Sequence, residues 1–180
     1  HTNDRRQRQM CIRDRIRPYK HNRVAAKAVS VEQTSNFGGG AVWPWETMKG
    51  VSDAAHELGL AMHMDGARLL NAAVASGRPA SDYAKLCDTT WIDLSKGLGC
   101  PVGAVLVGSK DAIYEAWHWK HQFGGSMRQA GIIAAAGVYA LEHHIDRLAD
   151  DHENARRLAR GLAQIAVSYT HLRAHETHND

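Results

Sequence analysis

The sequence predicts an α/β fold with a mostly parallel sheet and flanking helices. Short apolar segments alternate with segments of helical period along most of the chain, which is typical of repeated strand–helix units. Polar residues gather at the ends of several apolar segments. Ligands of parallel sheets bind beyond the carboxyl ends of the strands, so a binding site is expected at that edge.

Four short apolar segments are predicted to be strands. Glycine, proline or polar residues bound each of them, as is usual for strands in α/β sheets. The last segment, GAVLVG, is nearly all apolar, which predicts a strand covered on both faces. In chain order the predicted strands are residues 28–34, 60–65, 89–94 and 103–108.

The segments between and after the strands are predicted to be helices. Pro44 suits the first turn of a helix, Ser81 is a candidate N-cap, and Gly59 and Gly77 are natural stops. The last-but-one helix is rich in alanine and is therefore expected to be buried. In chain order the predicted helices are residues 45–58, part of 66–77, 81–86, 111–120, 130–141 and 150–164.

The net charge of +3 does not predict an anionic partner, because much of the basic excess lies at the two ends. MCIRDR near the start and VSYTHL near the end can be back-translated into reverse-complementary DNA. Such an inverted repeat is what transposon-based sequencing adapters leave. We therefore interpret residues 1–15 and 167–180 as adapter-derived and exclude them from fold reasoning, with a natural basic tail as the alternative. Residues 16–166 are then near neutral, which argues against nucleic-acid or membrane binding.

The cysteines and histidines indicate the cellular compartment and the kind of site to expect. Residues 16–166 keep Cys87 and Cys100, too few for a disulfide framework, so we expect a cytoplasmic protein. No apolar run is long enough to span a bilayer. His143 and His144 are adjacent and point apart on a helix, so we predict no metal site.

Two predicted strand ends carry the residues suited to catalysis. His63 and Asp65 are two residues apart, so their side chains leave the strand on the same side, and Arg68 follows on the turn. Lys96 follows the next strand in DLSKGLGCPVG, where a fixed, partly desolvated amine can form an imine with a carbonyl. An acid, an arginine and a lysine at neighbouring strand ends suit pyridoxal 5′-phosphate (PLP), whose ring nitrogen a carboxylate keeps protonated.

Four motifs in order carry a family resemblance: EQTSNFGGGAVWP, HMDGARLLNAAVASG, LSKGLGCPVGAVLVG and FGGSMRQAGIIAAAG. Together they resemble the low-specificity L-threonine aldolases, PLP enzymes of the aspartate-aminotransferase fold. The resemblance covers nearly all of residues 32–159 and implies that residues 16–166 are a partial PLP-dependent transferase-like large domain. It implies cleavage of L-threonine or L-allo-threonine to glycine and an aldehyde.

The resemblance also implies roles for individual residues. Lys96 would bond covalently to PLP, Asp65 would pair with the pyridine nitrogen, and Arg68 would lie against the phenolic oxygen and the substrate carboxylate. His63 is either a catalytic base or a structural histidine. Ser95 either contacts the phosphate or satisfies backbone groups. In the full-length parent the resemblance implies a homo-oligomer, a dimer or a tetramer.

Several alternatives stay open. The family's N-terminal phosphate loop and C-terminal arginine do not lie within residues 16–166, so we expect a fragment that is inactive alone. The parent could instead be another fold type I lyase that eliminates a group from an aromatic or sulfur amino acid, although GGSMRQ favours the aldolase. A non-catalytic fragment with an exposed sheet edge is the third hypothesis. His121 replaces a cation of the family and Arg128 is either a site residue or structural, so aldehyde specificity stays open.

Overall fold

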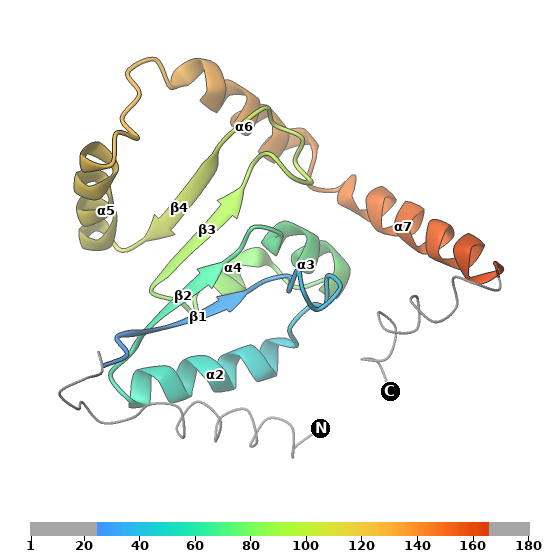
Figure 1. The fold of residues 1–180 in the computed structure, drawn as a ribbon, viewed down its shortest axis with the longest axis horizontal. Helices are drawn as coiled ribbons and strands as arrows, with labels where there is room; N and C mark the ends of the chain where they lie inside the picture. The colour runs from blue at the N-terminus through green and yellow to red at the C-terminus, as the bar shows by residue number, and fades with distance from the viewer. Residues whose placement is uncertain (1–24, 166–180) are drawn as a thin grey trace.

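A computed structural model describes residues 25–165. In it the protein forms one mixed sheet with helices around it (Figure 1). The strands lie in the order β1-β2-β3-β4. β1 (Ala28–Glu32), β2 (Ala61–Asp65) and β3 (Thr89–Asp93) are parallel, and β4 (Ala104–Gly108) pairs antiparallel with β3. The predicted α/β fold with a mostly parallel sheet is confirmed. The ends interpreted as adapter-derived lie outside the described residues.

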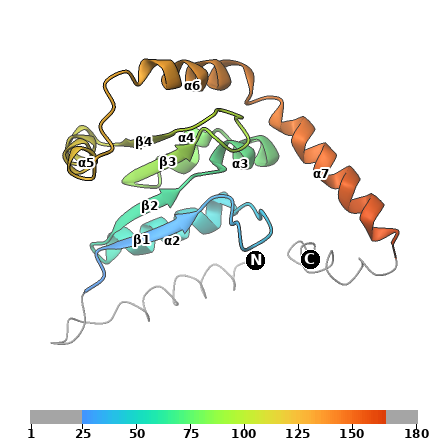
Figure 2. The same ribbon diagram turned by 45° about the horizontal axis from the view of Figure 1, so that its top comes forward.

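The helices connect the parallel strands and then follow β4. In chain order they are α2 (Trp45–Glu57), α3 (Leu69–Ser76), α4 (Ala80–Ala84), α5 (Lys110–Gln122), α6 (Gly131–His143) and α7 (Leu148–Ala163). α7 extends away from the sheet in both views (Figures 1 and 2). No helix between residues 25 and 165 is long and apolar enough to cross a membrane.

Helix starts follow local sequence, with one correction. Pro44 precedes α2 as expected, and the Ser109 hydroxyl caps α5 by accepting a hydrogen bond from the Ala112 N–H at 3.2 Å. Ser81 does not cap α4, because Pro79 is the residue before that helix and Ser81 lies inside it. The fixed φ of a proline already suits a helix entry, so α4 begins earlier than predicted.

One face of the sheet packs against α2. Side chains alternate between the two faces of a strand, and Val31, Met62 and Met64 point to this side. They are buried together with Met48 and Val51 of α2. Burying a large apolar side chain contributes about 1.5–3 kcal/mol, so this cluster holds β1 and β2 in place.

The segment after β3 has a small core of its own. Leu94, Leu98 and Cys100 pack with Ala140 of α6, and the Leu98 carbonyl lies 2.7 Å from His144 Nδ1. These contacts fix the turn that carries Lys96 to the end of the sheet.

Two burial predictions are wrong. All five residues of β4 are exposed, although GAVLVG was expected to be covered on both faces. The alanine-rich α6 buries only Gly137 and Ala140. Apolar composition reflects burial in the complete molecule, and in the described part of the chain β4 is an edge strand.

Candidate active site

The carboxyl ends of β2 and β3 bring Asp65 and Lys96 to one region of the sheet. Asp65 is the last residue of β2 and lies opposite Trp91 of β3 in the parallel register. Residues paired in this way project to the same face. Lys96 Nζ lies 5.6 Å from the centre of the Trp91 ring. The indole therefore lies beside both predicted site residues.

Lys96 forms an ion pair that sequence reasoning missed. Its Nζ lies 3.1 Å from Asp93 Oδ2, and the Asp93 side chain is only 13% exposed. Burial alone would raise the pKa of the Asp93 carboxyl, but the hydrogen bonds from Ser95 and the Lys96 ammonium outweigh it and hold that pKa below its ordinary value. The available signal was an acid three residues before the lysine, close to the end of a predicted strand.

Ser95 contacts Asp93. Its backbone N–H and its hydroxyl both donate to Asp93 Oδ1, at 2.8 Å and 2.7 Å. A carboxylate that accepts an N–H two residues ahead closes a local turn. The phosphate contact of Ser95 stays a prediction. The alternative was that its hydroxyl bonds to backbone groups; in the structure the hydroxyl instead donates to the Asp93 side chain.

Asp65 and Arg68 are held by the turn after β2. Asp65 Oδ1 accepts the Ala67 N–H at 3.1 Å, which orients the carboxylate. The Arg68 N–H donates to the Gln33 carbonyl at 3.2 Å, so the turn is tied to the end of β1. Gly66 is required here, because a Cβ would lie 2.5 Å from the Trp91 carbonyl oxygen.

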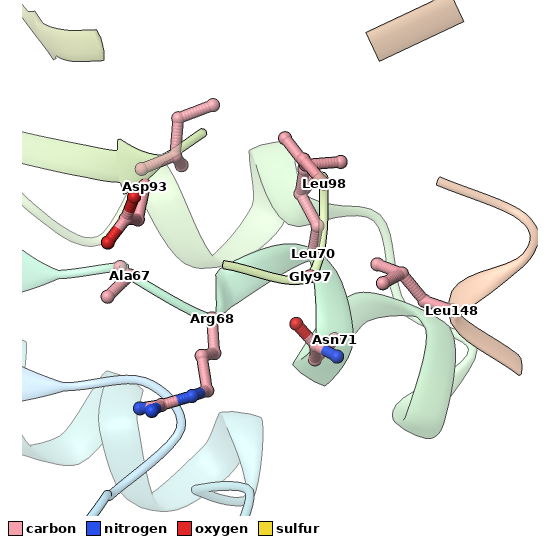
Figure 3. Close-up of a pocket in the computed structure, with 10 residues that line it drawn as sticks. Ala67, Arg68, Leu70, Asn71, Asp93, Gly97, Leu98 and Leu148 are labelled. Atoms are coloured by element: carbon pink, nitrogen blue, oxygen red, sulfur yellow. The ribbon is translucent and has the colours of Figure 1, made fainter. Parts of the chain in front are cut away.

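A small hollow separates this turn from the segment that carries Lys96 (Figure 3). Its charged lining residues are Arg68 and Asp93. The Arg68 side chain extends away from Asn71, toward the segment that follows β1. Asn71 joins α3 to α7 through a 3.2 Å contact between its Nδ2 and His152 Nε2. At Gly97 a Cβ would lie 2.9 Å from Leu148 Cδ2, so the hollow is closely packed on that side.

His63 lies on the same strand face as Asp65, as predicted from their spacing. Its Nδ1 lies 2.8 Å from the Thr89 hydroxyl, the residue opposite it on β3. This contact occupies one ring nitrogen and fixes the ring against the sheet. A catalytic role for His63 stays a prediction.

The remaining candidates lie elsewhere in the described structure. His121 is in α5, where its Nδ1 lies 2.8 Å from the Trp117 carbonyl oxygen. Arg128 lies in an exposed turn between α5 and α6. Neither lines the hollow beside Asp93.

Relatives of known name match this chain in sequence. The chain is 44% identical over 153 residues to the low specificity L-threonine aldolase of Escherichia coli strain K12, a match that covers 85% of the chain and 45% of the relative. It is 38% identical over 153 residues to low-specificity L-threonine aldolase 1 of Arabidopsis thaliana, covering 85% of the chain and 43% of the relative. The chain therefore spans about half the length of these relatives.

A solved structure and a family match agree with these relatives. The chain superposes on the threonine aldolase of Leishmania major with a TM-score of 0.74 at 21% identity, covering 87% of the chain and 46% of that structure, which shows a shared fold. The family described as beta-eliminating lyase matches residues 8–180. The resemblance to the low-specificity L-threonine aldolases is confirmed, and the chain belongs to the beta-eliminating lyase family.

Proposed function

We propose that this chain is the central cofactor-domain segment of a PLP-dependent lyase. The parent enzyme cleaves L-threonine or L-allo-threonine into glycine and an aldehyde. The observation that carries the proposal is the meeting of the Lys96 amine and the Asp65 strand end around Trp91. Because the chain spans about half the length of its relatives, the activity is assigned to the full-length parent enzyme. Residues 1–15 and 167–180 are proposed to be adapter-derived and not part of that enzyme.

The donor set fits PLP. A pyridine nitrogen needs a carboxylate, an aldehyde needs an amine, and an anionic oxygen needs a cation; Asp65, Lys96 and Arg68 supply these three groups at adjacent strand ends. When bound, PLP accepts the electron pair that the broken Cα–Cβ bond leaves behind. The fixed hydrogen bond from Ala67 to Asp65 keeps the carboxylate oriented without reorganisation.

The chain's own residues divide the remaining work. The Lys96 amine is presented from a turn whose ends are fixed by the Leu94–Leu98 core. Arg68 offers a guanidinium that can bind a carboxylate through two parallel hydrogen bonds. With PLP bound, Asp65 would stabilise positive charge on the pyridine nitrogen and would thereby lower the barrier to bond cleavage.

The family's description favours one second candidate. A beta-eliminating lyase would use the same lysine and carboxylate to expel a group from Cβ of an aromatic or sulfur amino acid. This reaction releases ammonia and a 2-oxo acid, whereas the aldolase reaction releases glycine and an aldehyde. Product identity therefore separates the two reactions.

We also propose that the parent is a cytoplasmic homo-oligomer. The described residues contain the thiols of Cys87 and Cys100 in free form, which suits a reducing compartment. Large apolar side chains of β4 and α5, including Leu106 and Trp117, are exposed. Such surface is normally covered by further chain or by another subunit.

The test is product analysis with the full-length parent, PLP and L-threonine. Lys96→Ala is expected to lower glycine and aldehyde formation by about 10³-fold or more, and Asp65→Asn to lower it strongly. Lys49 is a matched control, since its side chain and that of Lys96 are both 39% exposed and each is ion-paired; Lys49→Ala is expected to keep full activity. Unchanged aldehyde release in Lys96→Ala would contradict the role assigned to Lys96, and 2-oxo acid as the main product would contradict the aldolase assignment.

A further inference from the structure

The ion pair of Lys96 has a more shielded carboxylate than the comparable pair in α2. The side chains of Lys96 and Lys49 are equally exposed, at 39%. Their partners are not: Asp93 is 13% exposed, whereas Asp53 is 43% exposed. A carboxylate shielded from water attracts a neighbouring ammonium more strongly than an exposed one. The Lys49–Asp53 contact is shorter, at 2.7 Å against 3.1 Å, but Asp93 is the carboxylate that water screens less.

The Asp93 carboxylate is also fixed in orientation. Oδ1 accepts both hydrogen bonds from Ser95, which leaves Oδ2 directed at Lys96 Nζ. Across the sheet, Asp93 lies opposite Ala104 of β4, and Trp91 lies between Leu106 of β4 and Asp65 of β2. Asp65 is the charged residue among these three. Rotation of the carboxylate would break the bonds from Ser95, so the amine is held at a defined place.

We propose that Asp93, oriented by Ser95, is a positioning residue that holds the Lys96 side chain over Trp91 in the cofactor-free protein. An amine engaged by a carboxylate is less free to approach other electrophiles, so the ion pair places the lysine for the cofactor and shields it from other carbonyl compounds. This inference rests on the proposed function for the role of Lys96. Ser95 then acts through Asp93.

The test measures the reactivity of Lys96 in the full-length parent without PLP. The protein is acetylated with limiting N-hydroxysuccinimide acetate at pH 8, and the rate at each lysine is read from peptide mass spectra. Asp93→Asn is expected to speed acetylation of Lys96 about threefold or more, because the ion pair that engages the amine is removed. Ser95→Ala is expected to give a smaller increase, since it frees the carboxylate without removing it.

Asp53→Asn is the matched control. It removes the exposed partner of Lys49 and is expected to change the rate at Lys49 by less than about twofold, with the rate at Lys96 unchanged. An unchanged Lys96 rate in Asp93→Asn, with Lys27 and Lys49 reacting as in the parent, overturns the proposal. If all lysines of that variant react faster together, the variant has unfolded; Ser95→Ala then decides, and an unchanged Lys96 rate there overturns the proposal equally. The measurement uses neither cofactor nor substrate, so an inactive parent would refute the proposed function without altering this result.

Discussion

Asp65 lies directly opposite Trp91 in the parallel register of β2 and β3, and the Trp91 ring lies 5.6 Å from Lys96 Nζ. A cation near the face of an indole is attracted by its electron-rich ring. The indole therefore links the two sequence motifs HMDGAR and LSKGLG in space. Strand register places Asp65 beside Trp91. The only long, flexible side chain in this arrangement is that of Lys96.

Gly66→Ala is expected to destabilise the protein. The added Cβ would lie 2.5 Å from the Trp91 carbonyl oxygen, and backbone on both sides must move. Overpacking of this kind costs about 1–3 kcal/mol, and it displaces Asp65 relative to Trp91. Urea unfolding of the full-length parent measures the loss.

Gly161→Ala is the control for that substitution. Gly161 lies within α7, and a Cβ there meets nothing within 4 Å. Alanine in a helix interior is expected to stabilise by up to about 1 kcal/mol. Equal effects of the two substitutions would show that the close approach at Gly66 is not a constraint.

Stability is expected to fall at acid pH partly through Asp88. The pKa of its carboxyl lies below the ordinary value of 3.8, chiefly because it accepts the Met62 N–H, and also through its contacts with His56. A lowered folded-state pKa adds stability that is complete above the ordinary value and is lost as pH falls through the folded value. Unfolding free energy should therefore decline below about pH 4.

Asp88→Asn isolates that contribution. The amide cannot ionise, so the variant should be less stable than the parent at pH 7 and should lose less stability between neutral pH and pH values below about 4. Urea unfolding over this range gives both slopes. Parallel curves for the two proteins would mean that Asp88 contributes nothing to the acid sensitivity.

The exposed edge strand is expected to make the 180-residue chain associate. Val107 of β4 is 51% exposed, and edge strands with apolar side chains pair with other chains unless a charge blocks them. Val107→Lys should therefore lower the mean mass measured by light scattering. Val102 is 50% exposed but precedes β4, so Val102→Lys should have a much smaller effect. If the unsubstituted 180-residue chain is a monomer, this interpretation is wrong.

The parts of the fold set by local sequence could be predicted. Between residues 25 and 165 the sequence pattern located each strand and helix within a few residues, and Pro44 marked the start of α2. The spacing of His63 and Asp65 placed both on one strand face, because side-chain direction alternates regularly along a strand. Lys96 was found from the motif around it.

Properties that depend on contacts between distant segments could not be predicted. Several acids could have paired with Lys96, and only the folded turn after β3 shows that Asp93 is the partner. The exposure of β4 depends on what packs against an edge strand, and composition carries no information about that partner. Trp91 lies beside Asp65 because of the register between β2 and β3, which is a property of two strands together.

The central claim is that Lys96 is the residue that binds PLP covalently. The most direct measurement is to load the full-length parent with PLP, reduce it with borohydride, digest it and locate the retained cofactor mass by peptide mass spectrometry. We expect the added mass on the peptide that contains Lys96, and its loss in Lys96→Ala. Cofactor mass on another lysine, or on none, would contradict it.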